Sequence, residues 1–243
     1  MNNSKSLVVP GFILALGLVI AALILGNTWK NVSRSNVTIT VTGSSEKNIN
    51  SDYAIWTGNF STESNVLENA YNSIKASSEK VKAYLISKGI AQDKIKFSSV
   101  RTTTLYVQND KGYATNQVSG FRLYMDVTVE SSDVDMIEKL SSESSELITQ
   151  GIDFNLNPPE YLYTKLADLK VEMIGLASQD AKVRAEQMAK STGNEVGEVR
   201  SSKMGVIQIN AQNSTDVSDY GVNDTSSKEK TIRAVVSMSF SIK

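Results

Sequence analysis

Paired carboxylates are the residues in this 243-residue chain whose spacing could support chemistry. Glu143 and Glu146 stand three residues apart, and Asp168 and Glu172 stand four apart, in segments that we expect to be helical. Residues at these spacings share one face of a helix, so each pair could act as acid and base or bind a cation. Because solvated helix faces produce such pairs routinely, the spacing alone does not predict a site.

A third acidic group, Asp216, Asp219 and Asp224, lacks the ligand spacing and the closing glutamate of a calcium-binding loop. The chain has no cysteine and no histidine. This composition excludes disulfides, thiolate nucleophiles, histidine-based triads and the usual zinc ligands. Phosphate-binding glycine motifs and nucleophile elbows are also missing from the sequence. We therefore predict no catalytic residue, no cofactor and no metal site.

The charge balance excludes one class of partner. The chain carries 25 basic and 26 acidic residues and forms no basic stripe. Nucleic-acid-binding surfaces are strongly basic, so we predict no nucleic-acid partner.

The N-terminal segment predicts a membrane anchor. Leu7 to Gly26 contains no charge, and its length in a helix is about 30 Å, the thickness of a hydrocarbon core. Trp29 and Lys30 follow as a membrane-interface anchor. We expect an uncleaved transmembrane helix over residues 1–26 and a linker over 27–36; a cleaved signal peptide and a buried core helix are the alternatives. Charge does not settle the orientation, and we expect the C-terminal part to be periplasmic or on the cell surface.

Hydrophobic periodicity predicts the remaining elements, as one α+β domain over residues 37–243. Strands are expected over 37–41, 53–61, 95–108, 113–130, 152–164, 196–209 and 231–242, and helices over 63–88, 133–150 and 165–191. The middle of the chain, 53–164, has the β-α-β-β-α-β order of ferredoxin-like units. We expect an antiparallel sheet with helices packed on one face, plus a third helix and a C-terminal strand pair. The polar segment 210–230 is expected to be a long mobile loop.

Two helices are predicted to end alike. The stretches LISKGI, from Leu85, and LITQGI, from Leu147, each place a glycine after an apolar turn and an isoleucine after the glycine. This is the pattern of a left-handed glycine that ends a helix, with the isoleucine folding back onto it. An old duplication and shared capping rules explain the echo equally well.

Exposed aromatic residues suggest a subunit interface. Tyr106 and Tyr113 flank the predicted hairpin turn at 109–112, and aromatic residues at such a tip suit subunit contacts. The alternative is that they are ordinary strand residues. Three further tyrosines are expected to be exposed: Tyr161, Tyr163 and Tyr220.

An ordered set of segments carries a family likeness. These segments are VTGSSEKNI, AYLISKGIAQDKIKFSSV, SGFRLYMDVTVESSDVDMIEKL, GIDFNL, ASQDAKVRAEQMAKSTGNEVGEV and IRAVVSMSFSIK. Together they resemble the SIMPL-domain family, which includes bacterial periplasmic and outer-membrane immunogenic proteins. The resemblance implies an exported α+β protein, ring-like homo-oligomers in some members, and links to envelope or oxidative stress. It implies no enzyme activity and no catalytic residues.

The expected function combines these inferences. We expect a non-enzymatic, membrane-anchored extracytoplasmic protein that contacts the lipid bilayer and self-assembles into a ring-like homo-oligomer, with a structural or stress-protective role in the envelope. The first alternative is a binding module for a peptide, glycan or protein, acting through the sheet edge at Pro158 and Pro159 or through the segment 210–230. The second alternative is a hydrolase that uses carboxylates.

Overall fold

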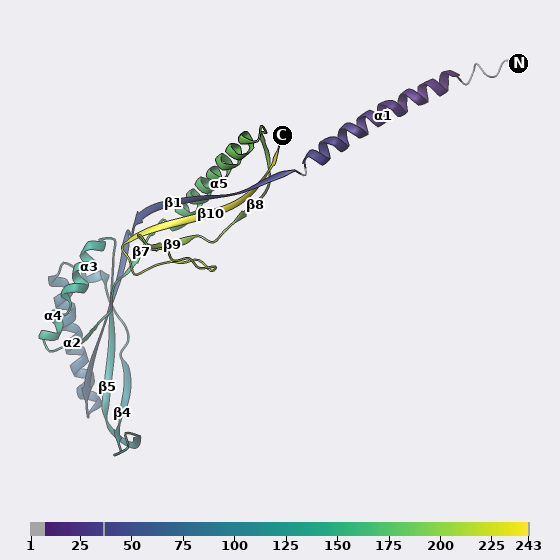
Figure 1. Cartoon of the computed structure of the whole chain (residues 1–243). Coiled ribbons are helices and arrows are strands. Elements are labelled where there is room, and N and C mark those ends of the chain that lie inside the picture. Colours follow the sequence, from purple (N-terminus) through teal and green to yellow (C-terminus); the bar gives the residue numbers. More distant parts are fainter. Residues whose placement is uncertain (1–7, 36, 243) are drawn as a thin grey trace. The chain divides into compact units, whose positions relative to one another are not determined.

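The computed structural model of the chain describes residues 8–35 and 37–242. It contains helices and antiparallel strands, which confirms the predicted α+β class (Figure 1). The chain divides into two compact units. Unit 1 comprises the described residues up to Lys47, Ala167–Ile207 and the stretch from Arg233; unit 2 comprises Asn48–Leu166 and Gln208–Ile232. The strands form two sheets where the sequence predicted one.

The first helix, α1 (Val8–Ser35), extends further than expected. Residues 27–35, predicted as a linker, are helical, because no proline or glycine follows Gly26 to end the helix. Large apolar side chains of α1, among them Phe12, Leu18 and Leu25, are exposed. Within the described residues, no helix is long and apolar enough to span a membrane, so the predicted transmembrane helix is not confirmed.

Unit 1 packs one helix tightly on a sheet. Strands β1 (Thr38–Asn50), β10 (Glu229–Ile242) and β8 (Val196–Met204) lie in the order β1-β10-β8, and β9 (Gln208–Ala211) also pairs with β10. Helix α5 (Leu166–Ser191) buries a stripe of four alanines: Ala177, Ala181, Ala185 and Ala189. A Cβ atom built on Gly43 of β1 would lie 2.7 Å from the Ala181 Cβ and closer still to the Ala177 carbonyl. The alanine stripe therefore lets α5 approach β1 closely.

Unit 2 holds the larger sheet, in the strand order β3-β5-β2-β6. Its strands are β2 (Tyr53–Ser64), β3 (Ile95–Phe97), β4 (Arg101–Gln108), β5 (Ala114–Ser131), β6 (Asp153–Leu156) and β7 (Glu160–Leu162). Strand β4 pairs with β5, and β7 pairs with β2. The predicted β-α-β-β-α-β order is present, but the strand expected over 95–108 is divided into β3 and β4, and the one expected over 152–164 into β6 and β7. Pro158 and Pro159 separate β6 from β7, as their missing N–H groups require.

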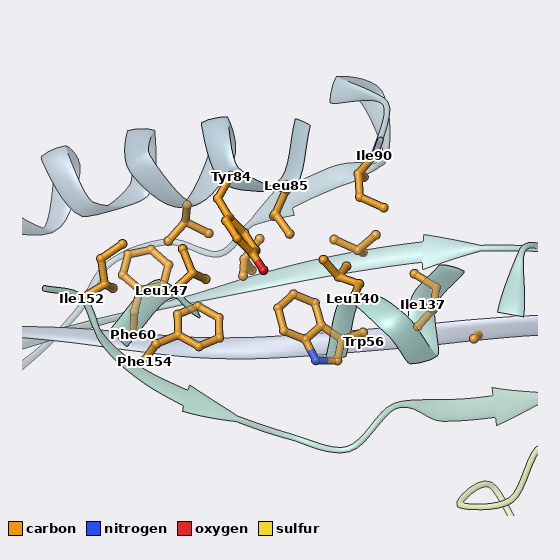
Figure 2. Close-up of a cluster of buried hydrophobic side chains, with 14 of the residues drawn as sticks. Trp56, Phe60, Tyr84, Leu85, Ile90, Ile137, Leu140, Leu147, Ile152 and Phe154 are labelled. Carbon is orange, nitrogen blue, oxygen red and sulfur yellow. The ribbon is translucent and has the colours of Figure 1, made fainter. Parts of the chain in front are cut away.

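Helices cover one face of this sheet and enclose an aromatic core. They are α2 (Leu67–Ser87), α3 (Val134–Glu143) and the short α4 (Glu146–Thr149), with a 3₁₀ turn at Gln92–Lys94. Figure 2 shows Tyr84 and Leu85 of α2 pointing toward Trp56 and Phe60 of the sheet. The Phe154 ring stacks on both sheet aromatics, with centroid distances of 5.9 Å to Trp56 and 6.3 Å to Phe60.

The predicted helix ends are confirmed. Gly89 and Gly151 have φ of 92° and 78°, and the following isoleucines, Ile90 and Ile152, are buried. The N–H of Ile90 donates to Leu85 O at 3.1 Å, and that of Ile152 donates to Leu147 O at 3.2 Å. These bonds satisfy carbonyls that the helix leaves free at its end.

The predicted helix starts need correction. The helix expected over 63–88 begins at Leu67 because β2 continues through Ser64. The helix expected over 133–150 breaks after Glu143, whose carbonyl accepts a hydrogen bond from the Tyr84 hydroxyl at 2.9 Å. Its cap is Asp133, whose side chain accepts a hydrogen bond from Met136 N, so the helix begins at Val134.

Candidate functional site

A two-stranded ribbon extends from the sheet of unit 2. Strand β2 pairs with β5 only as far as Phe121, and beyond that point the partner of β5 is β4. The turn forms at Asn109 because its side-chain oxygen accepts from Lys111 N and Tyr113 N, both at 3.0 Å. Figure 1 shows β4 and β5 running side by side to this turn. Two strands alone are marginally stable in water.

The ribbon exposes apolar side chains at its tip. Tyr106 is 47% exposed and Tyr113 is 69% exposed, so the predicted exposure of both residues is confirmed. Val107, next to Tyr106 in the chain, and Val118, which pairs with Tyr106 across the ribbon, are also exposed. An exposed apolar group of this kind on a protruding element is typical of an interaction site.

The outer edge of β4 carries no charged residue and no proline after Arg101. Among the described residues, β4 pairs with β5 alone, which leaves its other edge open. Its residues after Arg101 read TTTLYVQ, without charge or proline. Arg101 itself is held by Asp126, with nitrogen–oxygen distances of 2.8 and 3.0 Å. Edge strands usually carry lysine, proline or a bulge that prevents pairing with another chain. This edge has register irregularities between Leu105 and Gln108 but none of the charged devices.

The carboxylate pairs identified from the sequence form ion pairs. Glu143 and Glu146 both contact the Lys88 ammonium at 2.9 Å. The hydrogen bond from Lys88 lowers the pKa of Glu143. Glu172 pairs with Lys47 at 2.8 Å, and Asp168 lies in the first turn of α5. Glu143, Glu146 and Glu172 thus each link two segments through a lysine, whereas Asp168 forms none of the described ion pairs.

The acidic residues of segment 210–230 do not converge. Asp216 accepts from the Ser214 hydroxyl at 2.9 Å, and Asp224 accepts from the main-chain N–H of Ser226, also at 2.9 Å. Over residues 8–35 and 37–242, no three acidic side chains are grouped so that they could hold a metal ion.

Strand β10 contains a buried lysine that the sequence pattern did not predict. Lys230 is only 3% exposed, and its ammonium donates to the carbonyls of Tyr161, at 2.6 Å, and Asp224. Burial lowers the pKa of Lys230, and the charge of Asp224 opposes that shift. The alternation Ile232, Ala234 and so on marks the inward positions of β10, and extending it back by one step would have found this lysine.

Lys230 lines a cavity of about 220 Å³, here called the Lys230 pocket. Its other lining residues are Tyr161, Leu162, Tyr163, Thr164, Leu166, Ile209 and Asn223. Tyr161 was expected to be exposed, but it is 7% exposed because it faces the core of unit 2.

Buried polar side chains of β9 also hold segment 210–230, which belongs to unit 2. The Gln208 amide donates to Ser218 O at 2.7 Å, and the Asn210 amide donates to Asp216 O at 2.5 Å. The N–H of Val222 donates back to the Gln208 side chain at 2.8 Å. The segment expected to be a mobile loop is thus attached at several points, although its Tyr220 is almost fully exposed.

The predicted membrane-interface residues lie near the end of α1. Trp29 is exposed, and the side chain of Lys30 is outside the described part of the structure. Their predicted role in a bilayer stays a prediction.

The chain was also compared with known proteins. No curated protein matches it. The sequence profile of SIMPL, described as a protein of unknown function (DUF541), matches residues 39–240, which cover β1 through β10. The chain therefore belongs to the SIMPL family.

Proposed function

We propose that this protein is a membrane-anchored, extracytoplasmic subunit that assembles with copies of itself into a ring-like homo-oligomer. The observation that carries the proposal is the open edge of β4, which has no charge after Arg101. This strand forms one side of the exposed apolar ribbon. Such an edge offers main-chain N–H and C=O groups to another strand. We further propose that the assembly has a structural or protective role in the envelope and no enzymatic activity.

A second copy of this chain is the occupant that the edge favours. An antiparallel pair of β4 strands is a two-fold contact that joins two copies, so we propose that a second interface links such pairs into the ring. In an antiparallel pair of two β4 strands, the single charged residue of each, Arg101, would lie near the uncharged far end of the other. No like charges would then meet across the pair, so self-pairing carries no electrostatic penalty. The added strand would also convert a two-stranded ribbon into a wider, more stable sheet.

The apolar N-terminal segment supports the membrane part of the proposal. Leu7 to Gly26 carries no charge, and the apolar side chains of α1 are exposed. Burial of these side chains in a bilayer removes them from water. An anchor would also confine the subunits to one plane, which raises their effective concentration for assembly.

The test is the mass of the full-length protein in detergent, measured by light scattering and viewed by electron microscopy. We expect a ring-like oligomer for the natural sequence. The variant with Thr102→Lys and Val107→Lys places charges on both strands of the proposed pair, and we expect it to lose the ring and to have a smaller mass than the natural protein. A monomeric natural protein would refute the assembly.

A matched control adds the same charges elsewhere. Val171→Lys and Val183→Lys alter two exposed positions of α5, whose backbone groups are already paired within the helix. We expect this variant to keep the natural mass. An edge variant that stays assembled, or a control that dissociates, would show that β4 is not the interface.

A further inference from the structure

We propose that the Lys230 pocket is a binding site for a small carboxylate with an aromatic or branched apolar body. The pocket combines one buried charged side chain, Lys230, with walls that are mostly apolar or aromatic, such as Leu162, Leu166 and Ile209. A few polar groups within an apolar cavity are the usual composition of a small-molecule site. The site lies in unit 2 and shares no residue with the β4 edge.

The charge of Lys230 points to an anionic ligand. An ammonium group carries three N–H donors, and two of those on Lys230 bind main-chain carbonyls. Among the described residues, no carboxylate lies within ion-pairing distance, 4.0 Å, of its nitrogen. A buried charge without a close counter-ion is costly, so an incoming carboxylate that accepts the third N–H would offset part of that cost.

The structural role of Lys230 uses two of the three N–H donors of its ammonium group. Its two carbonyl bonds connect β7, at Tyr161, with segment 210–230, at Asp224. A lysine needed only for this connection would have no reason to line a cavity. The connection instead holds the ammonium in a fixed place at the pocket, which lowers the entropic cost of binding a ligand there.

The size and walls of the pocket define the rest of the ligand. A volume of about 220 Å³ is below the range of about 300–1,000 Å³ typical of drug-sized ligands, so we expect a single ring or a short branched chain. Tyr161, Leu162 and Tyr163 supply the apolar and aromatic surface that would pack against it. Phenylacetate has this combination of features and serves as the probe.

The test compares phenylacetate with its neutral analogue phenylacetamide, using full-length protein in detergent, by calorimetry and saturation-transfer NMR. We expect saturable binding of phenylacetate and affinity for the amide that is lower by about tenfold or more, because the amide lacks the charge that pairs with Lys230. Equal binding of the two probes, or no saturable signal from phenylacetate, would overturn the proposal.

Two variants separate the pocket from general effects. Lys230→Met should weaken phenylacetate binding by about tenfold or more, although it also removes the connection to segment 210–230. Asn223→Trp keeps that connection and fills the exposed rim of the pocket, where the Asn223 side chain makes none of the described hydrogen bonds. We expect it to abolish binding, whereas Val217→Trp, at an exposed position outside the pocket, should bind as the natural protein does. Unchanged binding by Asn223→Trp would refute the site whether or not Lys230→Met folds.

Discussion

The two units cover a sheet with a helix in opposite ways. In unit 1, α5 presents alanines to the sheet, and Gly43 of β1 lets the helix backbone come close. In unit 2, α2 and α3 cover large rings, with Trp56, Phe60 and Phe154 between helix and strand. The two interfaces therefore differ in whether the atoms in contact can shift. Backbone atoms at a close approach cannot move aside, whereas rings in a core can shift when a neighbour changes.

The largest effect is expected from truncating the aromatic core of unit 2. Trp56→Ala removes a fully buried ring that stacks on Phe154, and we expect a loss of about 3–5 kcal/mol in the free energy of unfolding. Urea denaturation followed by circular dichroism measures the loss. A change below about 1 kcal/mol would mean that the core collapses to fill the cavity, contrary to the close packing described.

A matched pair of glycine variants tests the comparison directly. A Cβ on Gly43 would meet main-chain atoms of Ala177 and Ala181, and a Cβ on Gly58 would meet the Phe154 ring. Each added carbon also lies 2.7 Å from a side-chain carbon, that of Ala181 or of Phe154. We expect Gly43→Ala to destabilise the protein by about 1–3 kcal/mol and Gly58→Ala to cost less, because only the ring can move away. The same urea denaturation measures both. Equal losses, or a larger loss for Gly58→Ala, would show that ring and backbone yield alike.

The smallest effects are expected from removing the polar contacts of the helices, made by Asp180 in unit 1 and Glu143 in unit 2. In unit 1 the pKa of Asp180 on α5 is lowered, first by a hydrogen bond from Ser44 N of β1, at 2.8 Å. In unit 2 the pKa of Glu143 is lowered, first by Lys88. A lowered pKa in the folded state means that the stabilisation is present above the ordinary value, 3.8 for Asp and 4.5 for Glu, and is lost as pH falls through the folded value.

The lowered pKa of each carboxyl group predicts what its neutralisation does to stability. Asp180→Asn and Glu143→Gln should each slightly lower the urea midpoint at pH 7, and the difference from the natural protein should narrow as the pH falls below those ordinary values. Because both groups are solvent-accessible, the effects should be small. A difference that widens toward acid pH would contradict the assignment of either link.

Local signals explain what could be predicted from the sequence. The ends of α2 and α4 depend on Gly89, Gly151 and their following isoleucines, so a window of six residues contains the whole cause. The same is true of the turn at Asn109 and the exposed Tyr113 beside it. The break after Glu143 has no such local signal, and the hydrogen bond that its carbonyl accepts there comes from the hydroxyl of Tyr84, 59 residues away in the chain.

The candidate sites also differ in whether local signals or contacts distant in the chain produce them. The exposed ribbon follows from alternation and turn chemistry, but the open edge of β4 depends on which strands pair. The Lys230 pocket depends on contacts of β7 with β9 and with segment 210–230, both of which are distant from β7 in the sequence. Composition alone suggested a mobile loop there, because the donors that attach it, Gln208 and Lys230, lie at or beyond its ends.

The attachment of segment 210–230 also bears on how the sequence can diverge. Gln208, Asn210 and Lys230 donate to carbonyl oxygens of Ser218, Asp216 and Asp224, and a carbonyl is present whatever side chain the residue carries. Between its ends, the segment can therefore exchange most side chains over generations and keep its anchoring points. We expect related proteins to retain the three donors while the residues between them drift, so that the surface of this segment becomes the part of unit 2 most open to new specificity.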